Sequence, residues 1–135
     1  MTATPTIESV MTPYPYTIEI DAHVGGAKSV LAQFGIHHLP VTEGGQLVGV
    51  VTAWGLKRAA EQGFDVAVGS ATRVRDVLSR EILTVAPEAP LPEVLMRMAD
   101  QHAEATLVVR DAKLLGIFTM TDACRHYARL LLGNP

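Results

Sequence analysis

The 135-residue sequence has little of what several classes of protein require. Its single cysteine, Cys124, excludes an internal disulfide framework and fits a reducing compartment. The 11 lysines and arginines are spread along a chain of net charge −3, so we expect no basic surface for nucleic acid. The longest apolar run, around residues 47–56, is far below the ~20 residues of a membrane span. Residues 1–9 have neither the basic start nor the apolar run of a signal peptide. The sequence therefore predicts a soluble, cytoplasmic protein that binds neither nucleic acid nor membrane.

Aromatic residues are also scarce, at 5% of the chain, whereas hydrophobic residues make up 48%. A chain of this length and apolar content can bury a sizeable core. Valine, leucine, isoleucine and alanine must fill most of that core. This composition is typical of mixed helix and strand packing rather than of an aromatic-rich β-sandwich.

The sequence repeats itself. A shift of 67 positions aligns residues 7–56 with the second half of the chain without a gap. Identical residues then coincide at strand and strand-end positions, for example Gly49 with Gly116 and Thr52 with Thr119. A random pairing would not place identities at these positions together, so we predict two copies of one unit. The two units are residues 7–62 and 74–132, and residues 63–73 link them.

Each unit shows the same order of expected elements, β-α-β-β-α after a short helical turn. Apolar residues at helical spacing indicate the helices, and short apolar runs between turn residues indicate the strands. The first unit is predicted to hold a helical turn at 7–11, strands at 16–18, 39–41 and 47–52, a helix from Val24 that stops at Gly35, and a helix at 53–62. The second unit is predicted to hold a helical turn at 74–78, strands at 83–85, 105–110 and 114–119, and helices at 91–99 and 121–132.

One such unit of about 60 residues is marginally stable alone, because one apolar face of its sheet stays uncovered. Two units can cover these faces by packing sheet to sheet with approximate two-fold symmetry. Such packing would leave two equivalent clefts. The expected fold is therefore α+β, with two tandem β-α-β-β-α units.

Three stretches resemble the most recognisable parts of a cystathionine-β-synthase (CBS) domain pair, also called a Bateman module. They are residues 10–13 (Val-Met-Thr-Pro), 35–41 (Gly-Ile-His-His-Leu-Pro-Val) and 116–122 (Gly-Ile-Phe-Thr-Met-Thr-Asp). The resemblance covers nearly the whole chain. It implies a stand-alone regulatory module whose ligand is an adenosine derivative: AMP, ADP, ATP, NAD or S-adenosylmethionine. It also implies a homodimer, a protein target that the sequence does not identify, and no required cofactor.

Carried over to this sequence, the family's pattern implies one competent ligand site between the units. The ribose would be held by Asp122 and the nearby threonines of the second unit, and the adenine by the first. The implied ligand-binding residues are Thr12, Tyr16, His37, His38, Pro40, Ile117, Thr119, Thr121 and Asp122. A carboxylate suits two neighbouring ribose hydroxyls, because it accepts both hydrogen bonds. His37, His38 and Arg125 are candidate phosphate partners, and Thr121 is placed to cap the last helix.

The second cleft departs from the family's pattern. It would combine Thr52 and Gly55 with Leu83, Glu104, Ala105 and Leu107. Gly55 stands where the first site has a carboxylate, and Glu104 would repel a phosphate. We therefore expect one competent site and one degenerate site.

Simpler roles remain open for the same residues. Asp122 could merely stabilise the dipole of the helix that it begins. His37 and His38 could be surface residues, or half of a metal site, although a doublet without a third ligand is weak evidence. No paired acid and base, activated nucleophile or glycine-rich phosphate loop is apparent, so we expect no enzyme. The alternative function is a protein–protein interaction scaffold that binds no ligand.

Overall fold

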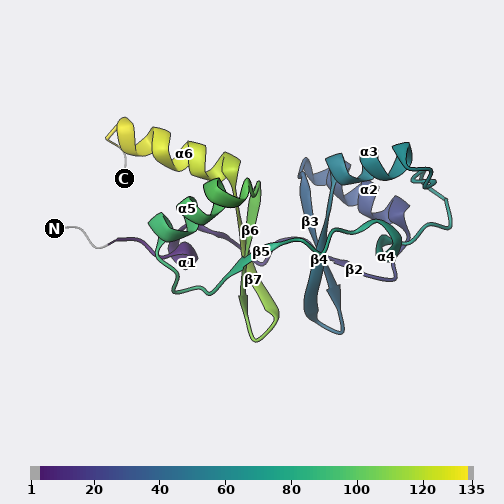
Figure 1. Cartoon of the computed structure of the whole chain (residues 1–135), viewed down its shortest axis with the longest axis horizontal. Helices are drawn as coiled ribbons and strands as arrows, with labels where there is room; N and C mark the ends of the chain where they lie inside the picture. The colour runs from purple at the N-terminus through teal and green to yellow at the C-terminus, as the bar shows by residue number, and fades with distance from the viewer. Residues whose placement is uncertain (1–3, 134–135) are drawn as a thin grey trace. The chain divides into compact units, whose positions relative to one another are not determined.

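The computed structural model describes residues 4–133, which form two compact units (Figure 1). One unit is continuous in sequence and runs from Tyr16 to Glu81. The other is split: it combines the residues up to Pro15 with those from Ile82 onward. We refer to them as the continuous unit and the split unit. The predicted α+β class is confirmed in both.

The continuous unit consists of a three-stranded sheet with helices packed on one face (Figure 1). Its strands are β2 (Ile18–Glu19), β3 (His38–Glu43) and β4 (Gln46–Thr52), in the order β2-β3-β4. Strand β2 is parallel to β3, and β4 is antiparallel to it. The helices are α2 (Val24–Phe34), α3 (Ala53–Glu61) and α4 (Val74–Val77). Buried Val, Leu, Ile and Ala side chains from all three helices and the sheet form one core.

The split unit contains a four-stranded sheet and three helices. Its strands are β1 (Thr12–Pro13), β5 (Leu83–Val85), β6 (Ala105–Arg110) and β7 (Lys113–Thr119), in the order β1-β7-β6-β5. The helices are α1 (Ile7–Val10), α5 (Leu91–Gln101) and α6 (Met120–Leu131). The core of this unit lies among α1, α5 and the sheet, and Phe118 is its largest fully buried side chain.

The compact units exchange their first helical turns relative to the sequence repeats. Helix α1 begins the first repeat, but its Ile7 is fully buried in the core of the split unit. Strand β1 continues this segment and pairs with β7, where Thr12 lies opposite Ile117. Helix α4 begins the second repeat, and its Val74 is fully buried in the core of the continuous unit. The main chain at Ser79 then exchanges two hydrogen bonds with Val50 of β4, at 2.8 and 2.9 Å.

Two glycines allow this exchange, because in each repeat the incoming segment crosses the sheet directly over one of them. A Cβ atom on Gly49 would lie 2.5 Å from the Ser79 carbonyl oxygen. A Cβ on Gly116 would collide with the Met11 side chain and lie 2.9 Å from the Thr12 carbonyl oxygen. These are the glycines that coincide in the repeat, so their identity follows from close packing of the main chain.

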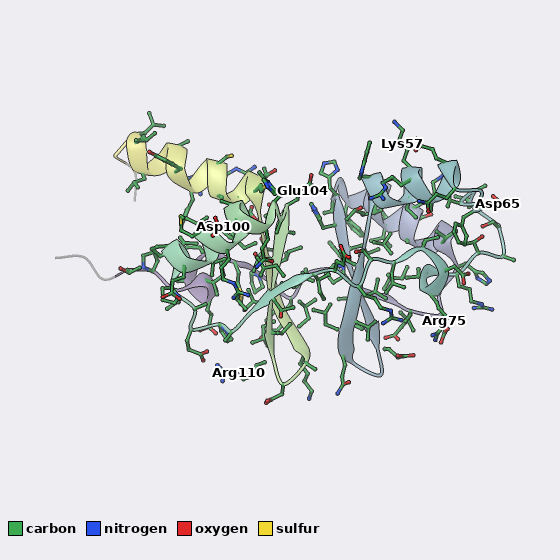
Figure 2. The ribbon with its side chains drawn as sticks, in the orientation of Figure 1. Lys57, Asp65, Arg75, Asp100, Glu104 and Arg110 are labelled. Carbon is green, nitrogen blue, oxygen red and sulfur yellow. The ribbon has the colours of Figure 1, made fainter. Side chains whose placement is uncertain are left out.

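An ion pair on the protein surface also connects helix α4 to the rest of the continuous unit. Arg75, labelled in Figure 2, donates two hydrogen bonds to Asp21 Oδ1 at 3.0 and 3.1 Å, and Glu43 lies 3.3 Å from the same guanidinium. The hydrogen bond with Asp21 and its negative charge raise the pKa of Arg75 above its usual value. The pair is exposed, so its contribution to stability is small.

Between residues 4 and 133, no helix combines the length and the apolar character that a membrane crossing requires.

Candidate functional site

In each unit, three strand ends gather at one edge of the sheet. Strands β2 and β3 are parallel and therefore begin at the same edge, where antiparallel β4 ends. Strands β5, β6 and β7 repeat this arrangement in the split unit. The predicted ligand-binding residues belong to these two edges or lie close to them. Thr12, Ile117, Thr119, Thr121 and Asp122 belong to the split unit, and Tyr16, His37, His38 and Pro40 belong to the continuous unit.

The edge of the split unit, which we call the acidic edge, presents Asp122 at the start of α6. Thr119 is the N-cap, and its Oγ1 accepts a hydrogen bond from the Asp122 N–H at 3.2 Å. In return, Asp122 Oδ2 accepts one from the Thr119 N–H at 2.9 Å. This reciprocal capping box holds the carboxylate at the strand-to-helix junction. Our assignment of the N-cap to Thr121 was wrong, because the helix already begins at Met120.

The Asp122 carboxylate keeps part of its hydrogen-bonding capacity. Its side chain is 27% exposed, and Oδ1 lies 3.6 Å from Arg125 Nη1. An ionised carboxylate offers about four lone-pair positions, and the capping box uses one of them. Capping the helix and binding a ligand are therefore compatible roles for this residue.

The remaining predicted residues of the split unit lie on neighbouring elements. Thr12 is exposed and lies opposite buried Ile117 in the pairing of β1 with β7. Thr121 is exposed on the first turn of α6. Glu104, labelled in Figure 2, lies immediately before β6, and its carbonyl oxygen accepts a hydrogen bond from the Met120 N–H at 2.9 Å.

The edge of the continuous unit carries aromatic and histidine side chains, and we call it the aromatic edge. Tyr16 lies two residues before β2 and stacks on Phe34, the last residue of α2, with ring centroids 4.0 Å apart. Gly35 ends α2 in the left-handed conformation, with φ 61°. The chain then passes through exposed His37 into β3, which begins at half-buried His38.

Burial and packing set two residues near the aromatic edge apart. Pro40 is fully buried within β3, opposite Val50, which limits its access to a ligand. Phe34 follows the helical spacing of core residues, but the residue is 42% exposed and its ring stacks on Tyr16. Helical periodicity does not reveal that the segment before β2 runs past the end of α2.

The junction that corresponds to Thr119–Asp122 in the first repeat keeps the cap and lacks the carboxylate. Thr52 Oγ1 accepts a hydrogen bond from the Gly55 N–H at 2.8 Å. Trp54 occupies the place of Thr121 and is 62% exposed, with Lys57 Nζ 5.5 Å from its ring centroid. This junction can begin a helix, but it presents no anionic group to a ribose.

A metal centre or a pocket elsewhere in the described residues could mark a different site. In residues 4–133, no three His, Cys, Asp or Glu side chains are grouped so that they could hold a metal ion. A shallow pocket of about 470 Å³ lies in the continuous unit, between the first turns of α2 and residues 68–71. None of the nine predicted residues lines it.

The CBS domain family matches residues 7–62 and 74–129, and the chain belongs to that family. It is 31% identical over 131 residues to an L-aspartate semialdehyde sulfurtransferase from Methanosarcina acetivorans. It is 33% identical over 122 residues to a homoserine O-acetyltransferase from Methanococcoides burtonii. These alignments cover 94% and 88% of the chain but only 25% and 23% of the relatives. The chain thus spans about a quarter of the length of these curated relatives.

Solved structures share the fold over nearly the whole chain. A Vibrio cholerae protein proposed to act in acetoin utilization (AcuB) has a TM-score of 0.84 at 26% identity, covering 96% of this chain and 94% of its own. The CBS domain pair of protein MJ0100, in complex with 5′-methylthioadenosine and S-adenosylmethionine, has a TM-score of 0.80 at 22% identity, covering 93% and 98%. CBSX2 in complex with AMP has a TM-score of 0.76 at 23% identity, covering 93% and 97%.

Proposed function

We propose that this chain is a regulatory module that binds one adenosyl ligand through residues of both repeats. The candidates are AMP, ADP, ATP, NAD and S-adenosylmethionine. The ribose would bind at Thr119 and Asp122 of the acidic edge, and the base at Tyr16 and the His37–His38 segment of the aromatic edge. Ligand binding would favour one arrangement of the module over another and so act on a protein target.

The observation that carries this proposal is the fixed position and partial exposure of the Asp122 carboxylate. Its carboxylate is held at a strand-to-helix junction by the capping box and is still 27% exposed. A fixed anionic acceptor suits a pair of hydroxyl donors, because little side-chain freedom is lost when they bind. The crystallised complexes of MJ0100 and CBSX2 support the proposal from outside, since proteins of the same fold accept adenosyl ligands.

We assign ligand binding, and no catalytic step, to the two CBS domains of this chain. The two curated relatives are named as enzymes, but the match covers only a quarter of each. Their activities therefore need not belong to the portion that resembles this chain. A CBS pair beside a catalytic domain is consistent with a regulatory role.

Isothermal titration calorimetry with AMP, ATP, NAD and S-adenosylmethionine tests the proposal. We expect Asp122→Ala to weaken binding of the best of these ligands at least about tenfold, because a hydrogen bond to a charged group contributes about 1.5–3 kcal/mol. Asp76→Ala is the matched control: Asp76 Oδ2 also accepts a capping hydrogen bond at 2.9 Å, from the Arg73 N–H at the start of α4. The proposal fails if none of the four ligands binds below the millimolar range, or if both variants change affinity equally.

A specific observation also favours a second candidate function, an interaction scaffold that needs no ligand. Helix α6 has no buried residue, and its apolar side chains are 51–73% exposed at Met120, Tyr127, Leu130 and Leu131. Exposed apolar side chains that share one helix face indicate association with protein, and a homodimer is the simplest form. Native mass spectrometry of the freshly purified protein separates the two functions. A co-purified adenosyl ligand supports the regulatory module, whereas a ligand-free oligomer supports the scaffold.

A further inference from the structure

The stack of Tyr16 on Phe34 is a fixed feature of the aromatic edge. The two ring centroids are 4.0 Å apart and the ring planes are inclined by 13°, so the rings lie nearly face to face. Phe34 ends a helix of 11 residues whose Leu31 is buried in the core, which restrains its backbone. The Phe34 ring is therefore attached to a restrained backbone, and the Tyr16 ring packs against it.

Tyr16 remains accessible in spite of the stack. Tyr16 is 52% exposed as a residue, although Phe34 stacks on one face of its ring. An exposed aromatic face attached to a restrained ring is a good surface for a planar base, because stacking buries apolar area with little loss of side-chain freedom. His37 lies at the same edge, one residue before β3.

We propose that Phe34 is a positioning residue, which holds the Tyr16 ring so that the purine of the adenosyl ligand stacks on its open face. The inference rests on the proposed function and adds a residue that the family's motif does not include. Phe34 acts only through Tyr16. Without Phe34 the Tyr16 ring rotates freely, and the ligand must order it on binding.

The other repeat has no equivalent of this stack. The positions that correspond to Tyr16 and Phe34 are Leu83 and Gln101. Leu83 is buried in the core of the split unit, so it cannot offer an open face to a base. Base stacking is thus confined to the aromatic edge, just as the carboxylate is confined to the acidic edge.

The test compares AMP with ribose 5-phosphate, which keeps the sugar and the phosphate and has a hydroxyl group in place of the base. Phe34→Leu is expected to raise the Kd for AMP about three- to tenfold, in line with the energy of an aromatic pair, and to leave ribose 5-phosphate unchanged. Saturation-transfer NMR detects both ligands, including weak binding. Phe64→Leu is the matched control, because Phe64 lies in the same unit with the same 42% exposure. It should leave both affinities unchanged.

A double-mutant cycle shows whether Phe34 acts through Tyr16. In a Tyr16→Leu background, Phe34→Leu should have no further effect on AMP binding. The inference is overturned if the two changes add, if both ligands weaken equally, or if Phe34→Leu behaves like Phe64→Leu. Failure of the proposed function looks different: the unaltered chain then binds none of the adenosyl ligands. Binding that Asp122→Ala weakens and Phe34→Leu leaves intact removes the inference alone.

Discussion

The two repeats keep the same threonine capping hydrogen bond at their strand-to-helix junctions and carry different chemistry there. Thr52 and Thr119 cap α3 and α6 in the same way, through a bond from the N–H three residues on. The residue three positions after the cap is Gly55 in one repeat and Asp122 in the other. The cap and the apolar pattern are sufficient to build the junction. A side chain at that third position can therefore be gained or lost as function requires, and the fold does not depend on it.

The same contrast recurs at the turns. The first repeat places glycines where φ is positive, with Gly35, Gly44 and Gly45 at 61°, 59° and 82°. The second repeat holds His102, Asp111 and Ala112 at the corresponding positions, at 52°, 53° and 64°. A residue with a Cβ atom is strained in this region, so the second repeat retains the geometry at a cost in stability. The two repeats thus have the same backbone conformation at these turns, although they differ in the residues that stabilise it.

The largest effect is expected when a fragment is cut at the bounds of the sequence repeat instead of the bounds of the compact unit. A fragment of residues 16–81 should unfold cooperatively on heating, as followed by circular dichroism. A fragment of residues 7–62 should not, because it lacks Val74 and exposes Ile7, both fully buried in the chain. Burying one such side chain contributes about 1.5–3 kcal/mol, a large share of the stability of so small a unit.

Residues 16–71 make the matched control, since this fragment has the length of 7–62 and also lacks α4. It should resemble 7–62 rather than 16–81. A cooperative transition in 7–62 at the temperature of 16–81 would show that the sequence repeat, rather than the compact unit, is the folding unit.

A smaller effect should distinguish the two crossing glycines. Gly49→Ala should lower the free energy of unfolding by about 2–3 kcal/mol, and Gly116→Ala by about 1–2 kcal/mol. The difference arises because the atom nearest Gly49 is a main-chain oxygen held by the Ser79–Val50 hydrogen bonds, whereas the atoms nearest Gly116 belong to the flexible Met11 side chain. Urea unfolding measures both.

The control for these substitutions is Gly26→Ala in α2. The atom nearest to its added Cβ is 3.8 Å away, so the change should stabilise the helix by up to about 1 kcal/mol. If Gly116→Ala proved more costly than Gly49→Ala, the two crossings would not differ in the way that their contacts indicate.

The smallest effect concerns the hairpin turns. Ala112→Gly should raise the free energy of unfolding by about 0.5–1 kcal/mol, since glycine removes the strain of a positive φ. The reciprocal change, Gly45→Ala, should lower it by about 1 kcal/mol. No atom lies within 4 Å of the Cβ that this change adds, so its cost comes from the backbone alone. Equal stability of Ala112→Gly and the unaltered chain in urea would contradict this account.

The sequence predicts most elements of the fold because the signals are local. Helix α2 and strands β5 and β6 are confirmed at the predicted residues, and the Gly35 stop of α2 is confirmed by its left-handed conformation. Strand β1 could not be predicted, because two residues show no periodicity and its partner β7 lies more than a hundred positions away. The exchange of helical turns is hidden for the same reason, since a gap-free alignment leaves each turn beside its own repeat.

For the candidate site, the sequence predicts positions better than it predicts contacts. The motif at residues 116–122 predicts that Asp122 lies at a strand-to-helix junction, as the structure shows. It does not predict that Asp122 and Thr119 bind each other, because the first residue of a helix is uncertain from sequence. Phe34 is hidden among apolar residues at helical spacing. Only the three-dimensional path of the segment before β2 shows that Phe34 meets Tyr16.

The exchange of first helical turns also fixes an order of events while the ribosome is making the chain. Everything that the continuous unit needs has been synthesised once Glu81 emerges, so this unit can fold early. Ile7 and Thr12 are synthesised before the continuous unit but must wait for their partner strand β7, which is synthesised after it. The apolar segment around Ile7 therefore stays exposed while the continuous unit folds, and a chaperone could bind it during that time.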